Sequence, residues 1–127
     1  MIDWKKPRVY HATLTQWNWV VHHPEHFVLG DSVDIGAFTF INAKQGVIIE
    51  DNVQIGAHCA IYSVSTIDGK QGPVILKKNC KIGTHSTIMP NVTIGENTVV
   101  GAYSFVQRSV GANQMVRCVP KNFRRML

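Results

Sequence analysis

The chain has 127 residues, of which 45% are apolar and 17% are charged, and its formal net charge is +5. This is the size and composition of one soluble globular domain, and no apolar run is long enough to span a membrane or to form a signal peptide. With only three cysteines, an odd number, we expect reduced structural thiols and a cytoplasmic location. The positive charge favours anionic partners, and because no basic run alternates with aromatic residues, we expect phosphorylated small molecules and not nucleic acid.

Residues 1–28 show no repeat. They contain all three tryptophans and four of the six histidines, and Pro7 and Pro24 interrupt them. We predict an irregular or partly extended N-terminal cap, because the exposed end of a stacked core has to be covered. The sequence HHPEH at residues 22–26 is interpreted as cap surface or as part of an acceptor pocket, in preference to a metal site.

Residues 29–110 follow a period of six. Two sets of aliphatic residues keep it: Leu29, Ile35, Ile41, Ile49, Ile55 and Ile61, and then Leu76, Ile82, Ile88, Ile94, Val100 and Val106. Glycine follows many of these positions, and a small or compact side chain stands four residues after most of them. A fixed short period indicates one structural unit stacked on copies of itself.

Three such hexapeptides make one triangular turn, so the pattern predicts an all-β parallel helix of about four coils. The period is interrupted twice, after Ile41 and after Ile61, and both insertions leave the stack at the same corner. The second insertion, residues 63–73, is polar and glycine-rich and is predicted to be a protruding loop at a binding face. Residues 111–127 form a short tail.

Once the turns are fixed, four residues share one outward corner: Phe38, His58, His85 and Tyr103. Neighbours in this column should lie about 5 Å apart at the backbone. The sequence therefore predicts that two histidines lie side by side although 27 positions separate them. A neutral imidazole there could take a proton from a hydroxyl or amino group that attacks a carbonyl. The alternative is that both are solvent-exposed corner residues without a role.

The stretch at residues 81–106, KIGTHSTIMPNVTIGENTVVGAYSFV, resembles the hexapeptide-repeat acyltransferases. Within them it is similar to sugar O-acetyltransferases of the maltose and galactoside type, and the likeness extends over residues 29–125. The chain departs from that pattern where Lys81 replaces a tryptophan, and where Asn91, Tyr103 and Cys118 replace glycines.

The resemblance implies a left-handed parallel β-helix and a homotrimer with its active sites between subunits. It also implies acetyl-coenzyme A as the donor and His85 as the general base. Ala102, Arg108 and Lys121 stand where the family contacts the coenzyme, and basic side chains suit its phosphates.

The acceptor half of the site is predicted from position. His58 is assigned to acceptor binding or to tuning His85, and Phe38 and Tyr103 line the same column. Asn42 stands close to where the family has a polar ligand, and Asp68 lies in the inserted loop, which we interpret as a wall of the neighbouring subunit's pocket. The predicted function is acetyl transfer to a sugar hydroxyl or amino group, with a nucleotide sugar or polysaccharide precursor as acceptor and no metal.

Two other classes remain open at this point. One is a non-catalytic scaffold or binding subunit built on the same stack. The other is a zinc enzyme like the γ-class carbonic anhydrases, which use a His-x4-His pair and a third histidine. Here the fifth residue after His85 is Pro90, so that spacing is absent.

Overall fold

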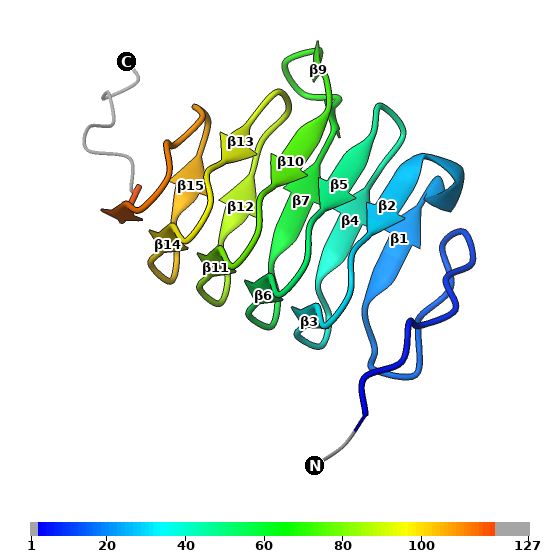
Figure 1. Ribbon diagram of the computed structural model, residues 1–127. Helices are drawn as coiled ribbons and strands as arrows, with labels where there is room; N and C mark the ends of the chain where they lie inside the picture. The colour runs from blue at the N-terminus through cyan, green and yellow to red at the C-terminus, as the bar shows by residue number, and fades with distance from the viewer. Residues whose placement is uncertain (1–2, 119–127) are drawn as a thin grey trace.

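The computed structural model describes residues 3–118, which form a parallel β-solenoid with three flat sides (Figure 1). One side is a five-stranded sheet, the side next to the histidine column: β1 (Val20–His22), β4 (Phe40–Asn42), β7 (Ala60–Tyr62), β12 (Thr87–Ile88) and β15 (Phe105–Val106). The second side has four strands: β2 (Phe27–Leu29), β5 (Val47–Ile49), β10 (Val74–Leu76) and β13 (Thr93–Ile94). The third side has five: β3 (Asp34–Ile35), β6 (Gln54–Ile55), β11 (Lys81–Ile82), β14 (Val99–Val100) and β16 (Met115–Val116).

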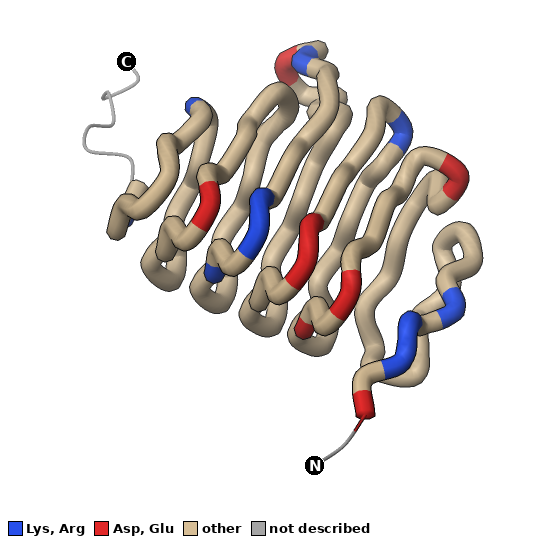
Figure 2. Tube along the Cα trace, viewed as in Figure 1, with Lys and Arg blue, Asp and Glu red and all other residues tan. Residues whose placement is uncertain are grey.

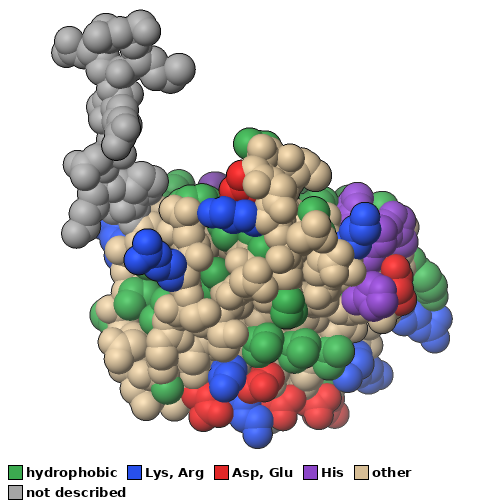
Figure 3. All heavy atoms as spheres, turned by 90° about the horizontal axis from the view of Figure 1, so that it is seen from above, with side chains coloured by type: hydrophobic (Ala, Val, Ile, Leu, Met, Phe, Trp, Pro, Cys, Tyr) green, Lys and Arg blue, Asp and Glu red, His purple; other side chains and the backbone are tan. Residues whose placement is uncertain are grey.

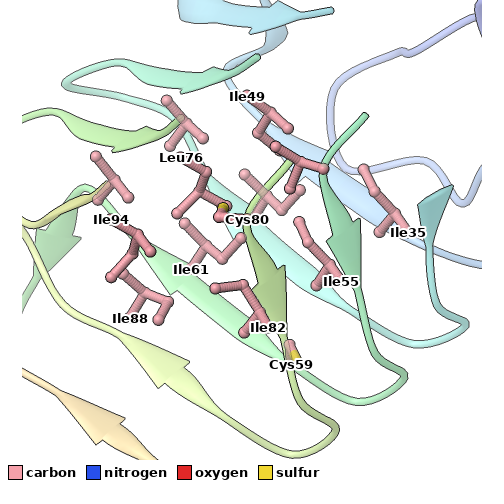
Figure 4. Close-up of a cluster of buried hydrophobic side chains, with 14 of the residues drawn as sticks. Ile35, Ile49, Ile55, Cys59, Ile61, Leu76, Cys80, Ile82, Ile88 and Ile94 are labelled. Atoms are coloured by element: carbon pink, nitrogen blue, oxygen red, sulfur yellow. The ribbon is translucent and has the colours of Figure 1, made fainter. Parts of the chain in front are cut away.

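The six-residue period gives the register of the stack. Ile41 pairs with Ile61 and Ile61 with Ile88, so equivalent residues of successive turns lie above one another. The same holds for Ile49 and Leu76 on the second side. These side chains point inward and are fully buried, and Figure 4 shows them filling the centre of the solenoid. The predicted all-β stack is confirmed, and its core is a column of aliphatic side chains.

The solenoid has more turns than the four predicted. Strand β1, from the segment expected to be an irregular cap, pairs in parallel with β4 through Val21 and Ile41. At the other end β16 pairs with β14, and Val110 forms a bridge with Ile94. Val21 is the inward repeat residue of this turn, but it stands eight residues before Leu29, and the residue six positions before it is the polar Thr15. Trp19, buried near Phe27, stands where the next turn has Thr39. A single 3-10 turn, η1 (Pro24–His26), joins β1 to β2, and residues 3–118 contain no α-helix.

A glycine follows many of the aliphatic residues of the six-residue period. It is required there because the backbones of successive turns approach each other closely. A Cβ on Gly56 would lie 2.6 Å from the backbone nitrogen of Thr84 in the next turn. Gly83 meets the backbone of Ala102 in the same way. Only a residue without a side chain allows the turns to stack this closely at that corner.

The second insertion is a small β-hairpin, and not an irregular loop. Strand β8 (Val64–Ser65) pairs antiparallel with β9 (Lys70–Gln71), and Asp68 lies in the turn between them. The first insertion leaves at the same corner, as predicted. The Gln45 side chain of this insertion donates to the side chain of Gln71 in the second at 3.0 Å. Both insertions therefore lie beyond the end of the strands β4 and β7 that precede them.

The charges do not form a basic stripe along the solenoid. Figure 2 shows acidic and basic residues following one another along one corner from turn to turn. Some of the acids bind backbone of the adjacent turn, as Asp51 accepts from the amide of Asp31 at 2.8 Å and Glu50 from that of Lys78 at 3.1 Å. No helix among the described residues is long and apolar enough to cross a bilayer.

We expect Gly56→Ala to lower the free energy of unfolding by about 1–3 kcal/mol, because the new methyl group overlaps the backbone of Thr84. The matched control is Gly111→Ala, where nothing lies within 4 Å of the added Cβ. Urea denaturation of both variants checks this. Equal midpoints for the two variants would contradict the close-approach explanation.

Candidate functional site

The predicted column exists and is a continuous stack of four rings at one corner of the solenoid. The centroids of Phe38 and His58 are 5.3 Å apart, those of His58 and His85 are 4.8 Å apart, and those of His85 and Tyr103 are 4.8 Å apart. The rings of His85 and Tyr103 are nearly parallel, at 9°. The sequence prediction that distant histidines become neighbours is confirmed.

The backbone holds these side chains in one direction. All four residues have positive φ values between 57° and 64°. The amide of each donates to a carbonyl of the preceding turn, as His85 does to Ala57 at 3.0 Å and Tyr103 to Thr84 at 2.9 Å. The repeated corner conformation makes the side chains leave the solenoid in parallel. Their stacking is therefore a consequence of the register.

The position of the Thr84 hydroxyl favours the tautomer of a neutral His85 that carries its proton on Nδ1. The hydroxyl of Thr84 donates its one hydrogen to the carbonyl of Ala57 at 2.7 Å. The same oxygen lies 2.9 Å from His85 Nδ1, where it can only accept. The other ring nitrogen, Nε2, is then left with its lone pair free. An exposed imidazole in this tautomer is suited to accept a proton from a bound hydroxyl or amine.

A second row of side chains supports this corner from inside. Ser86 donates to the carbonyl of Gly101 at 3.2 Å and accepts from the amide of Ser104 at 3.2 Å. Thr39 likewise donates to the carbonyl of Gly56 and accepts from the amide of Cys59. The small residues four positions after the aliphatic repeat residues therefore form hydrogen bonds between each turn and the next, directly behind the rings. They satisfy backbone groups that a buried corner would otherwise leave unpaired.

A groove with a volume of about 370 Å³ lies beside the column, on the outer face of β3, β6, β11 and β14. Its lining includes Asp34, Gln54, Lys81, Thr84 and Ala102. Within residues 3–118 the amide of Ala102 donates to no acceptor. Ala102 as a residue is exposed at the same corner as the rings.

Three predicted site residues lie at the other end of the strands that begin at the histidine corner. Asn42 ends β4, and its side-chain oxygen accepts from the amide of Lys44 at 3.0 Å and from Ser63 at 3.4 Å. Asp68 lies at the hairpin tip, where hydrogen bonds from the Ser65 side chain and the Lys70 amide lower its pKa. Arg108 is exposed, after β15. Within one chain none of the three meets His85, and Lys121 lies outside the described residues.

The histidines of the N-terminal segment form a separate cluster. The ring of His11 lies 5.1 Å from that of His22 and 5.0 Å from that of His23, and Figure 3 shows histidines gathered at one end of the molecule. His11 Nδ1 accepts from the amide of His23 at 2.9 Å. In the described part of the chain, no group of three or more His, Cys, Asp or Glu side chains is arranged to hold a metal ion.

Sequence reasoning missed Thr84. The signal was present, because Thr84 immediately precedes the histidine in the column, and its side chain can reach both the preceding turn and the neighbouring ring. The six-residue period predicts which backbone positions of successive turns lie above one another and whether a side chain points inward or outward. It does not give the hydrogen-bond partners of a hydroxyl.

The hexapeptide pattern is matched by two family models. Residues 73–108 match "Bacterial transferase hexapeptide (six repeats)", and residues 46–69 match "Hexapeptide repeat of succinyl-transferase". The chain is 30% identical over 124 residues to galactoside O-acetyltransferase of Escherichia coli, with 86% of this chain and 61% of that protein covered. It is 33% identical to a serine acetyltransferase of Synechococcus elongatus, with 68% and 37% covered. The chain thus spans less than two thirds of the length of these relatives.

The chain is also similar to acyltransferases among the solved structures. AntD, an N-acyltransferase from Bacillus cereus, is 27% identical with a TM-score of 0.67, and the match covers 84% of this chain and 75% of that one. That structure contains dTDP and 3-hydroxybutyryl-CoA. A related structure of an AntD mutant contains dTDP-4-amino-4,6-dideoxyglucose and coenzyme A.

We expect the thiols of Cys59 and Cys80 to be unreactive in the folded protein. Burial, with a smaller effect of the Glu50 carboxylate, raises the pKa of Cys80 to about 12, and burial also raises that of Cys59. A shift of this size leaves Cys80 with about a thousandfold less thiolate than an ordinary thiol at neutral pH, and the thiolate is the reactive form. In a Cys118→Ser variant, Ellman's reagent should therefore label nothing until urea unfolds the chain. Rapid labelling of the folded variant would show that a thiol is accessible for covalent chemistry.

Proposed function

The chain belongs to the hexapeptide-repeat acyltransferase superfamily, and we propose that it transfers an acetyl group from acetyl-coenzyme A to a sugar hydroxyl or amino group. The observation that carries the proposal is the exposed His85 ring, whose Nδ1 faces Thr84 and whose Nε2 is free. Relatives support the chemistry, since the similar proteins include O-acetyltransferases and an N-acyltransferase crystallised with a coenzyme A ligand and a nucleotide.

In the proposed reaction His85 Nε2 takes the proton of the acceptor hydroxyl or amine as its oxygen or nitrogen attacks the thioester carbonyl carbon. The new bond gives a tetrahedral oxyanion. When the oxyanion collapses, the carbon–sulfur bond breaks and the imidazolium returns its proton to the coenzyme thiolate. The transfer is direct within a ternary complex, so no cysteine acts as a nucleophile, and the buried positions of Cys59 and Cys80 agree with this.

For the coenzyme, we propose the groove beside the column. The free amide of Ala102 is suited to a carbonyl of the pantetheine arm, and Arg108 and Lys121 are proposed to contact the phosphates. His58, in van der Waals range of His85, and the flanking Phe38 and Tyr103 rings are proposed to contact the acceptor.

We further propose that the working unit is a homotrimer with the site between subunits. Phe38 and Tyr103 are 57% and 62% exposed, although both are large and apolar and stand in one row. Asn42, Asp68 and Arg108 lie at the opposite corner of the same face, so they would reach His85 only from a neighbouring chain. Asn42 is then available as an oxyanion ligand and Asp68 as a wall of the acceptor pocket. Light scattering coupled to gel filtration measures the assembly.

The first prediction for this mechanism concerns His85. We expect His85→Ala to reduce kcat by about 10²–10⁴-fold, because the general base is lost, while coenzyme A still raises the melting temperature. Turnover is measured as release of free coenzyme with a galactoside or dTDP-4-amino-4,6-dideoxyglucose as acceptor. The control is Tyr10→Ala, which changes an exposed aromatic residue that is part of no proposed site and should leave both readouts unchanged. Near-normal turnover of His85→Ala would contradict the role of His85 as general base. If coenzyme A left the melting temperature of the wild-type chain unchanged, the assignment as an enzyme would be wrong.

The second prediction concerns Thr84, as a positioning residue. Thr84→Val keeps the shape of the side chain and removes the oxygen that faces Nδ1. The ring is then free to carry its proton on Nε2, which cannot act as a base, so kcat should fall by about tenfold or more with little change in KM. Thr84→Ser keeps the hydroxyl and should restore kcat.

Nitrogen-15 NMR of the His85 ring gives a readout that does not depend on activity. Wild type and Thr84→Ser should show the proton on Nδ1, and Thr84→Val should show it on Nε2 or exchanging between the two. The same tautomer in all three proteins would contradict the role of Thr84.

A further inference from the structure

The N-terminal segment and the first turns of the solenoid enclose a second cavity that the proposed reaction does not use. Its volume is about 530 Å³, and its lining includes Asp34 and Ile35 of β3. All three tryptophans line it, together with Asp3, Lys5, Pro7 and Gln16. The gathering of tryptophans that marked residues 1–28 in the sequence is therefore a gathering in space.

Two of these tryptophans are held in place by hydrogen bonds. The indole Nε1 of Trp4 donates to the carbonyl of Val33 at 3.0 Å, so this ring is tied to the solenoid by its only polar atom. Trp17 stands on a tight turn in which the side chain of Thr15 accepts from the amides of Trp17 at 3.3 Å and Trp19 at 3.4 Å. The walls of the cavity are thus organised before any ligand arrives.

Covering the core explains only part of this arrangement. Trp19 is 3% exposed and packs edge-on against Phe27, so it closes the end of the aliphatic core. Trp17 remains 46% exposed and covers nothing comparable. An exposed indole beside hydrogen-bonding side chains suits a ligand with one apolar face and a polar edge.

We propose that this cavity, which we call the tryptophan pocket, binds a neutral pyranose ring of a glycan acceptor. The C–H groups on the face of a pyranose pack on the electron-rich face of an indole, and its hydroxyls donate to carboxylates such as Asp3 and Asp34. With Lys5, the two acids give the charged side chains of the lining a net charge of −1, which favours a neutral ligand over a phosphorylated one. A planar nucleobase could also stack on Trp17, and it is an outcome that the test separates.

The tryptophan pocket and the groove beside His85 share one lining residue. Asp34 lines both, and it pairs through Gln54 with Lys81, which stands in the same groove as Thr84. Two strand spacings, about 10 Å, separate the levels of Asp34 and Lys81 along the stack. A glycan of more than one sugar could therefore keep one ring in the tryptophan pocket while another presents its hydroxyl to His85. This role in acceptor binding rests on the proposed function, whereas sugar binding in the pocket does not.

The test is a titration of the whole chain by tryptophan fluorescence, without coenzyme, using four neutral tetrasaccharides built on maltose, cellulose, laminarin and mannan linkages, and dTDP in parallel. We expect a saturable change with at least one tetrasaccharide, with a Kd of about 1 mM or below. Trp17→Ala and Trp17→Leu should both weaken this binding at least about tenfold, since leucine is apolar but offers no aromatic face. Tyr10→Ala removes an aromatic residue that is even more exposed than Trp17 and does not line the cavity, and this variant should bind as the wild type does.

Three results would overturn the proposal: no change with any tetrasaccharide, equal affinities for wild type and both Trp17 variants, or Trp17-dependent binding of dTDP alone. Melting temperatures and circular dichroism of the Trp17 variants verify that they fold. His85→Ala should bind the tetrasaccharide normally. If coenzyme binding and acetyl transfer fail while Trp17-dependent sugar binding persists, the enzyme assignment falls and the pocket stands. If acetyl transfer succeeds and sugar binding does not depend on Trp17, the enzyme assignment stands and the tryptophan pocket is not the sugar site.

Discussion

Parallel pairing between equivalent residues of successive turns is the constraint on which the rest of this molecule depends. Because Ile41, Ile61 and Ile88 align without slippage, each position of a turn acquires an equivalent about 4.8 Å above and below it. Inside the solenoid this alignment produces a continuous aliphatic column. At the outer corner the same alignment stacks Phe38, His58, His85 and Tyr103 ring on ring. The same strand register therefore aligns both the core residues and the rings of the candidate site.

The corner beneath the rings needs two kinds of small residue for different reasons. Gly56 and Gly83 are there because a Cβ would overlap the backbone of the next turn. Ser86 and Ser104 are there because their hydroxyls bond backbone groups of the adjacent turns. Close stacking and complete hydrogen bonding leave little freedom for the backbone at this corner, which suits a site where a ring nitrogen must hold one direction.

What the sequence could predict follows from the same distinction. A period determines which residues share a face, so the fold, the buried ladder and the histidine neighbours were all accessible from spacing. Strand β1 was not, because its inward residue Val21 has no aliphatic partner six residues before or after it in the sequence. The hairpin at residues 64–71 and the partners of Thr84 were not accessible either. They depend on hydrogen bonds between particular atoms, and a repeat pattern contains no information about these.

The separation of the predicted site residues is itself informative about assembly. The strands β4, β7 and β12 begin at the ring column and end at the corner of Asn42 and the hairpin, so one chain cannot bring its own Asn42 to its own His85. At the ring corner, in contrast, one chain provides the His85 ring, which we propose as the base, the Thr84 hydroxyl beside its Nδ1, and the groove lined by Thr84 and Ala102. A coenzyme held in this groove would meet Arg108 only from a neighbouring chain. An acceptor pocket that includes Asn42 or Asp68 requires a second copy, and the tryptophan pocket offers the acceptor a contact that requires none.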